Sequence, residues 1–235
     1  MVRHNVFAAQ NELDDEHWIY VSDLMAGLMV IFLFIAITYI RPVQEERDTV
    51  RDIAVDFQEA EENLYRALWE EFKDDLPQWG ASLDRKTLSI RFKAPEVLFD
   101  AAQVTLKERF KEIISDFFPR YIEVLRRFQK NIAEVRIEGH TSSEWAETSS
   151  RDEAYFKNMK LSQGRTREVL AYSLSLPSVE TRKAWIIKKL TANGLSSSQV
   201  IIENGSEDQD LSRRVEFRVR TNAKQQMVRI LETTR

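Results

Sequence analysis

The chain contains no cysteine, and its 235 residues include only 6 glycines, 5 prolines and 3 histidines. Without cysteine there is no disulfide, no thiol catalysis and no zinc site built on cysteine. The histidines, at positions 4, 17 and 140, are too scattered in the sequence to indicate a metal cluster. An excess of basic charge is also missing, because the formal net charge is −4. We therefore expect no metal, no cofactor and no nucleic-acid partner.

What the sequence does contain is one long apolar stretch, residues 18–40. A helix needs about 20 apolar residues to cross a bilayer core, so this stretch is long enough to span with some tilt. It is too long for the apolar region of a cleaved signal peptide, which has about 7–15 residues, and no small-residue cleavage site follows it. The sequence predicts an uncleaved transmembrane helix; the alternative is a buried helix of a soluble protein.

One acid, Asp23, lies inside this apolar stretch. A carboxylate at the centre of a membrane helix costs about 2.5–3.5 kcal/mol on the insertion scale, so such residues are rare and usually functional. Uptake of a proton would remove most of that cost and change the contacts with surrounding helices. Ala26 and Gly27 leave room for a neighbouring helix to approach. We predict that Asp23 carries an ion. The alternative is that its side chain extends to the membrane interface and has no role in ion transport.

The stretch is flanked by a short polar tail, residues 1–17, and a charged helical linker, residues 41–78. Pro42 suits the first position of a new helix. Apolar residues in the linker recur with the a and d spacing of a heptad repeat, which predicts pairing with a second copy of the chain. The alternative is one amphipathic helix that packs on its own domain. The repeat comprises Val43, Val50, Phe57, Leu64, Ile53, Ala60 and Ala67.

Residues 79–222 have the pattern of a soluble α+β domain, and residues 223–235 form a C-terminal tail. Alternation predicts strands at 87–92, 135–138, 199–202 and 215–219. Helical periodicity predicts helices at 104–130, 158–174 and 179–192, with Pro119 splitting or kinking the first and Asn193-Gly194 capping the last. We expect a mixed sheet with helices on one face.

Three motifs in this domain resemble the C-terminal domain of OmpA over residues 79–221. They are IEGHT at 137–141, NMKLSQGR at 158–165 and SRRVEF at 212–217, against a family pattern of GHTD, N-x-x-LS-x-x-R and RRV. The resemblance implies non-covalent binding of peptidoglycan through the diaminopimelate carboxylates of its stem peptide.

The same resemblance implies which residues bind. Arg165 would grip a carboxylate, because its planar fork matches that group bidentately. Asn158 and Leu161 would line the groove, with Thr141 and Ser142 at its rim. His140, Arg213 and Arg214 are expected to support the fold. No nucleophile and base are paired in the sequence, so we expect no enzyme activity.

The sequence departs from the OmpA family pattern at Ser142. At this position the family usually has the acid that holds the diaminopimelate amine. The segment from Ser142 to Leu161 is also longer than usual. Either an acid of this segment replaces the missing one, or the ligand is gripped differently. The acids in question are Glu144, Glu147, Asp152 and Glu153.

The complete layout resembles the MotB family of stator subunits. MotB-like spans begin D-x-M-T-x-x-M, and residues 23–29 read DLMAGLM, with Ala26 in place of threonine. The resemblance implies a single-pass inner-membrane protein with a periplasmic C-terminal domain. Two copies would sit inside a ring of multi-span MotA-like subunits, and protons or sodium ions would pass through Asp23.

Within this family the chain is more similar to the B subunits of Zorya anti-phage defence systems than to flagellar MotB. Flagellar members usually have a plug helix after the span and a more basic tail, whereas this tail is acidic at positions 12, 14, 15 and 16. We expect a proton-conducting, peptidoglycan-anchored stator subunit that works with a MotA/ZorA-like ring. The alternatives are a flagellar-type stator subunit and a passive tether from membrane to wall.

The charges flanking the span disagree with this orientation. Only Arg3 precedes the span, whereas Arg41, Arg47 and Arg51 follow it. The positive-inside rule would place the large domain in the cytoplasm. We give more weight to the family resemblance, because a wall-binding domain has no ligand in the cytoplasm.

Overall fold

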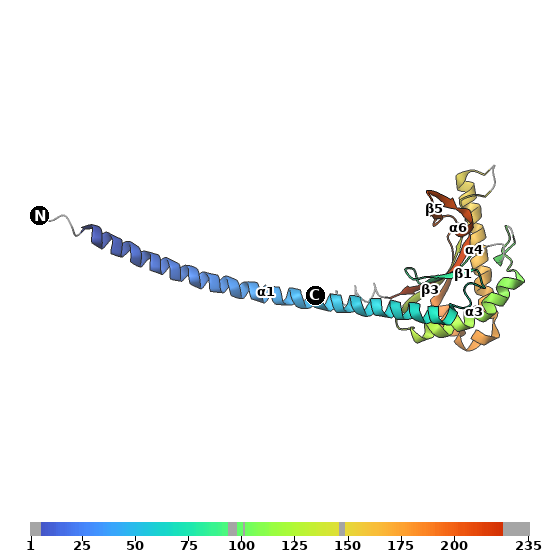
Figure 1. The fold of residues 1–235 in the computed structure, drawn as a ribbon, viewed down its shortest axis with the longest axis horizontal. Helices are drawn as coiled ribbons and strands as arrows, with labels where there is room; N and C mark the ends of the chain where they lie inside the picture. Colours follow the sequence, from blue (N-terminus) through green and yellow to red (C-terminus); the bar gives the residue numbers. More distant parts are fainter. Residues whose placement is uncertain (1–5, 94–97, 101, 146–148, 223–235) are drawn as a thin grey trace. The chain divides into compact units, whose positions relative to one another are not determined.

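The computed structural model describes residues 6–93, 98–100, 102–145 and 149–222. The chain divides into two units between Ala54 and Val55, and the first helix, α1 (Val6–Phe72), contributes to both (Figure 1). The predicted C-terminal tail, residues 223–235, lies outside the described residues, as do the first five residues of the predicted N-terminal tail.

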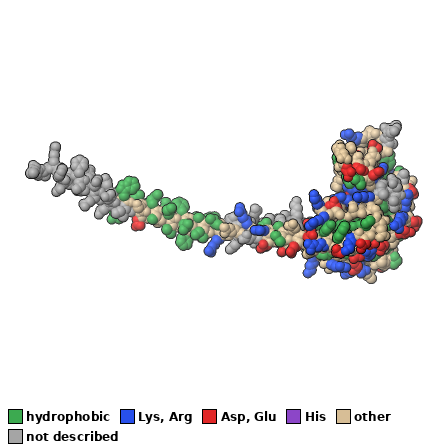
Figure 2. Space-filling view, in the orientation of Figure 1, with side chains coloured by type: hydrophobic (Ala, Val, Ile, Leu, Met, Phe, Trp, Pro, Cys, Tyr) green, Lys and Arg blue, Asp and Glu red, His purple; other side chains and the backbone are tan. Residues whose placement is uncertain are grey.

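The first unit contains the apolar part of α1. Residues Tyr20–Arg41 have a mean hydropathy of 2.3 and form the one helix in the described ranges that is long and apolar enough to cross a membrane. Their side chains are exposed, and Figure 2 shows hydrophobic side chains along this part of the helix. The predicted N-terminal apolar helix is thus confirmed.

The helix differs from the prediction at both ends of the span. It begins at Val6, inside the segment predicted to be a tail, and it runs through Pro42 without a break. A proline inside a helix costs about 3 kcal/mol, because it removes one backbone hydrogen bond. The helix nevertheless continues on both sides of Pro42, so no new helix starts there.

The second unit is built on a five-stranded sheet with the order β1-β2-β7-β3-β4 (Figure 1). Strands β3 and β4 are parallel, and the other neighbours are antiparallel. The sheet is therefore mixed, as predicted. The strands are β1 (Ala81–Asp84), β2 (Ser89–Phe92), β3 (Ile132–His140), β4 (Leu190–Gly194) and β7 (Arg214–Thr221).

Two long helices, α3 (Glu108–Arg127) and α4 (Arg151–Ser175), cover one face of this sheet. Helix α4 begins with a capping box, in which Ser150 and Glu153 bond to each other's backbone N–H. A separate hairpin pairs β5 with β6. The remaining elements are η1 (Pro177–Arg182), α5 (Lys183–Lys189), β5 (Ile201–Glu203), β6 (Ser206–Asp208) and α6 (Gln209–Ser212).

The core between sheet and helices is rich in aromatic rings. The ring centroid of Phe117 on α3 lies 5.0 Å from that of Phe217 on β7 and 5.2 Å from that of Phe92 on β2. These distances are typical of favourable edge-to-face packing. Fully buried aromatic residues thus fix the helix layer on the sheet.

The last turns of α1 belong to this core. Leu64, Leu68 and Phe72 are buried in it, and the Phe72 ring lies 5.2 Å from that of Phe117. At Leu64, the alternative to pairing therefore holds: this part of the linker helix packs on its own domain. Pairing of two copies stays a prediction for the earlier positions, of which Val50 and Phe57 are partly exposed.

Several predicted boundaries were wrong. Strand β1 was missed, and residues 190–194 form a strand where the end of a helix was predicted. Helix α3 begins at Glu108 and contains Pro119 without a break. The predicted strand at 199–202 exists in shortened form, but it pairs in the separate hairpin.

Close packing of α4 on the sheet predicts a large effect for Gly194→Ala. A Cβ atom at Gly194 would lie 2.3 Å from the backbone nitrogen of Gln163, so helix and strand must separate. We expect the free energy of unfolding to fall by about 3 kcal/mol, near the upper end for overpacking. Thermal denaturation of the full chain in detergent measures this. The neighbouring Asn193→Ala should change stability by less than about 0.5 kcal/mol; equal effects would show that this close approach is unimportant.

Candidate functional site

A cavity of about 460 Å³ lies where the end of β3, the first turns of α4 and the segment before α3 meet. All five residues predicted to bind peptidoglycan line it, although they come from two separate motifs. The structure thus brings the predicted binding residues together. The lining consists of Phe99, Asp100, Ala102, Lys107, Thr141, Ser142, Glu144, Trp145, Asn158, Leu161, Arg165 and Arg213.

Arg165 is the buried cation of this pocket, with 8% of the residue exposed. Its Nε donates to the carbonyl oxygen of Gln103 at 2.9 Å, and its Nη2 to that of Asp100 at 3.3 Å. Its guanidinium carbon lies 4.7 Å from the centre of the Phe99 ring. No described carboxylate forms an ion pair with Arg165. The pocket therefore holds a fixed positive charge that a ligand anion could neutralise.

Burial and the neighbouring charge of Arg213 lower the pKa of Arg165 to about 10. The guanidinium is still charged at neutral pH. Since desolvation disfavours the charged form, an anion bound in the pocket would be attracted more strongly here than on an exposed surface.

Asn158 holds the wall of the pocket in place. Its Nδ2 donates to the carbonyl oxygens of Ser142 and Glu144, each at 3.1 Å. The backbone N–H of Thr141 donates to the carbonyl oxygen of Ser196 at 3.0 Å. These bonds fix the chain that follows β3, so the predicted rim is rigid at Thr141 and Ser142, and Asn158 acts as its support.

The hydroxyl of Thr141 is buried and has no hydrogen-bond partner among the described residues. A buried polar group without a partner costs about 1–3 kcal/mol. Because Thr141 lines the pocket, a polar ligand could supply the missing bond. Leu161 adds a half-buried apolar surface to the same wall.

The structure also places unpredicted residues in the pocket. Arg213, expected to support the sheet, lines the cavity and pairs with Asp210. Asp100 lines the cavity and forms an ion pair with Lys107, with 3.0 Å between Oδ1 and Nζ. Asp100 lies in an irregular segment without periodic signal, whereas Arg213 belongs to the motif at 212–217, from which only a fold role was predicted. Only the closure of the chain around Arg165 brings them to the site.

Among the acids that could replace the missing one at Ser142, Glu144 lines the pocket. Glu153 is used in the capping box of α4, and Asp152 is not among the lining residues. Glu147 lies outside the described residues. Glu144 is therefore the acid whose position fits the role.

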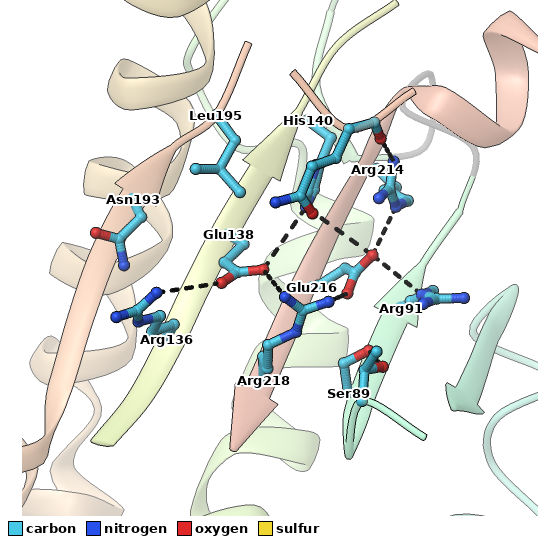
Figure 3. Close-up of polar contacts among 12 residues, drawn as sticks. Ser89, Arg91, Arg136, Glu138, His140, Asn193, Leu195, Arg214, Glu216 and Arg218 are labelled. Carbon is cyan, nitrogen blue, oxygen red and sulfur yellow. Dashed lines mark hydrogen bonds and ion pairs between the residues drawn. The ribbon is translucent and has the colours of Figure 1, made fainter. Parts of the chain in front are cut away.

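A second polar cluster lies on the sheet face opposite the helices (Figure 3). Ligand-type atoms of Glu138, His140 and Glu216 lie within 4.8 Å of one another, and all three residues are buried. Both ring nitrogens of His140 lack a hydrogen-bond partner among the described residues. Such a group could in principle hold a metal ion.

Arginines already compensate the two acids of this cluster. Glu216 Oε1 accepts from the Nε atoms of Arg214 at 2.6 Å and Arg91 at 3.0 Å. The Oε2 atom of Glu138 lies 3.1 Å from Nη1 of Arg218. A metal cation would have to compete with these guanidinium groups. The arrangement favours a structural network, in line with the predicted fold role of Arg214.

The charges in this network follow from its burial. Burial, together with the nearby Arg214, lowers the pKa of His140 to about 3, so the ring is neutral at physiological pH. Burial alone would raise the pKa of Glu216, but Arg214 and Arg91 hold it below its usual value. Burial raises the pKa of Glu138. Neutral His140 thus lies between two arginine-compensated acids, which suits a fold residue.

Comparison with known proteins identifies first the fold and then the family. A crystal structure of a MotB-like protein from Desulfovibrio vulgaris aligns with a TM-score of 0.50 at 23% identity, covering 70% of this chain and 93% of that one. The fold is thus MotB-like, as predicted. No protein-family model matches the sequence.

The Zorya protein ZorB of Escherichia coli is 47% identical over 224 residues, which cover 95% of both chains. The chain belongs to the ZorB family. This confirms the resemblance to the B subunits of Zorya systems that the membrane segment and tail indicated.

Proposed function

We propose that this protein is the peptidoglycan-anchored, ion-conducting stator subunit of an inner-membrane motor used in anti-phage defence. Membership of the ZorB family and the MotB-like fold support this function. The observation that carries the anchoring half is the buried charge of Arg165, which no described carboxylate pairs, in a pocket shared with the other predicted binding residues.

The pocket suits a ligand that carries both an acid and an amine. Arg165 and Arg213 supply positive charge for a carboxylate, and a guanidinium fork can bind that group with two parallel hydrogen bonds. Glu144 supplies the negative charge for an ammonium group, the role left open at Ser142. Diaminopimelate in the stem peptide of peptidoglycan has both groups, which makes it the ligand proposed here.

The ion-conducting part of the proposed function depends on Asp23. It is an acid inside a candidate span, where an ionised carboxylate is costly, and proton uptake relieves that cost. We place the span in the inner membrane and the domain in the periplasm. Two copies would share a ring of MotA/ZorA-like subunits, with protons or sodium ions as the transported ion. We expect no catalytic activity and no bound cofactor.

The anchoring half predicts that Glu144→Gln weakens wall binding. The substitution keeps the shape but removes the charge facing the ligand ammonium, and we expect affinity to fall about tenfold, which corresponds to ~1.4 kcal/mol. Co-sedimentation of the full chain in detergent with purified peptidoglycan sacculi measures this.

Glu203→Gln, an exposed acid in the β5–β6 hairpin, is the matched control and should bind like the wild type. Unchanged binding of Glu144→Gln would show that the amine is held elsewhere. Absence of binding by the wild-type chain would refute the anchoring function itself.

A further inference from the structure

Three exposed aromatic side chains lie in the segment that connects β3 to α4 and in the first turns of α4. The exposed fractions are 38% for Trp145, 36% for Tyr155 and 70% for Phe156. Large aromatic side chains in the core of the domain are buried instead, as Phe92 and Phe217 show. Exposed apolar surface at a pocket commonly marks a binding surface.

Of these three aromatic residues, Trp145 is the one that lines the pocket. It lines the cavity together with Arg165 and Asn158. The residue before it is held by the bond from Asn158 Nδ2 to the carbonyl oxygen of Glu144. The backbone that leads into Trp145 is thus held in place at Glu144.

Tyr155 and Phe156 are two further exposed aromatic residues, on the first turns of α4. Tyr155 lies three residues before Asn158, and residues with this spacing are neighbours on a helix. Its carbonyl oxygen accepts a hydrogen bond from Ser196 Oγ at 2.8 Å. The Tyr155 and Phe156 rings are 5.8 Å apart and meet edge to face. The two rings therefore contact each other on the first turns of the helix that supplies Asn158 and Arg165.

We propose that Trp145 is a saccharide-binding platform that stacks on a sugar ring of the glycan strand. This inference rests on the proposed function, because the glycan is near only when its stem peptide occupies the pocket. The face of an aromatic ring is electron-rich. It attracts the C–H bonds that cover one face of a pyranose, while the sugar hydroxyls stay in water.

The surface fits a sugar better than the apolar side chain of a peptide. A partly exposed indole provides a flat apolar face and a polar edge. A pyranose also has an apolar face, formed by its C–H bonds, and a polar edge, formed by its hydroxyl groups. The covalent bond between glycan and stem peptide places sugar rings next to the peptide pocket. The whole ligand would therefore be a disaccharide with its peptide, held at two adjoining subsites.

The test compares two soluble probes with the full chain in detergent: a disaccharide–peptide fragment of peptidoglycan and the same peptide without sugar. We expect Trp145→Ala to weaken the disaccharide–peptide about tenfold and to leave the free peptide within twofold. Trp145→Tyr should restore most of the affinity, because the tyrosine ring also offers a face. Trp69→Ala, which removes an exposed aromatic side chain outside the pocket, is the matched control and should affect neither probe.

The outcomes separate the platform from the pocket. If Trp145→Ala weakens both probes equally, the indole contacts the peptide and the saccharide platform is wrong. If it weakens neither, Trp145 makes no ligand contact. If the wild-type chain binds neither probe, the proposed anchoring function has failed, and the platform fails with it. An unchanged melting temperature of Trp145→Ala excludes loss of fold as the cause.

Discussion

Asp23→Asn is expected to abolish phage defence completely while the protein is still produced, inserted in the membrane and bound to the wall. Asparagine has nearly the same shape as aspartate but cannot take up and release a proton. The span remains apolar enough to insert, because the substitution removes a charge from it. The efficiency of phage plating on cells that carry the complete defence system measures the loss.

The matched control is Asp56→Asn, an exposed acid farther along α1 and outside the span. It should leave defence intact, since its carboxylate lies in water in either protonation state. Full protection by the Asp23→Asn variant would remove the ion-driven function and leave the passive tether. Both functions need Arg165 and Asn158 for wall binding, but only the ion-driven function needs Asp23, so the Asp23→Asn variant distinguishes them.

A complete loss is expected because the ion supplies the energy for the motion. Moving one elementary charge through the membrane field yields about 2.3 kcal/mol per 100 mV, and a motor must couple that energy to a change in protein contacts. A carboxylate that alternates between charged and neutral forms has two environments of different free energy. An amide has only one form, so no partial activity is expected from it.

The parts of the fold that sequence predicted correctly are those with strong periodicity. The long apolar stretch predicts a helix, and the alternation in residues 215–219 predicts β7 (Arg214–Thr221). Strand β4 (Leu190–Gly194) was missed because it is short and follows a helix directly. Its pairing with β3 sets Gly194 beside Gly139. That pairing depends on tertiary packing of α4, which periodicity does not contain.

The residues of the candidate site were likewise predicted only in part. Motif matching found Asn158 and Arg165, because one short stretch of α4 carries both residues. It did not find Asp100 or Trp145, which lie in irregular segments. Asp100 is held by the bond from Arg165 Nη2 to its carbonyl oxygen, and the backbone before Trp145 by the bond from Asn158 Nδ2 to the carbonyl oxygen of Glu144. Such long-range closure cannot be predicted from local spacing.

Arg165→Gln is expected to weaken binding to peptidoglycan sacculi about 100-fold. The guanidinium is buried and has no described carboxylate partner, so a ligand carboxylate would form its main ion pair. Truncating one partner of a buried hydrogen-bonded charge pair costs about 2–5 kcal/mol, and 100-fold corresponds to ~2.7 kcal/mol. Arg165→Lys should recover only part of the loss, because lysine keeps the charge but lacks the planar fork. Co-sedimentation of the full chain with sacculi measures both.

Two further variants separate ligand binding from support of the fold. Arg167→Gln removes an exposed arginine from the same helix and should bind normally. Arg165 also bonds to the carbonyl oxygens of Gln103 and Asp100, so its loss could loosen that wall. Thr141→Val avoids this problem, because its hydroxyl has no partner among the described residues. It should keep or raise stability and still weaken binding severalfold. Normal binding by both Arg165→Gln and Thr141→Val would place the wall ligand outside this pocket.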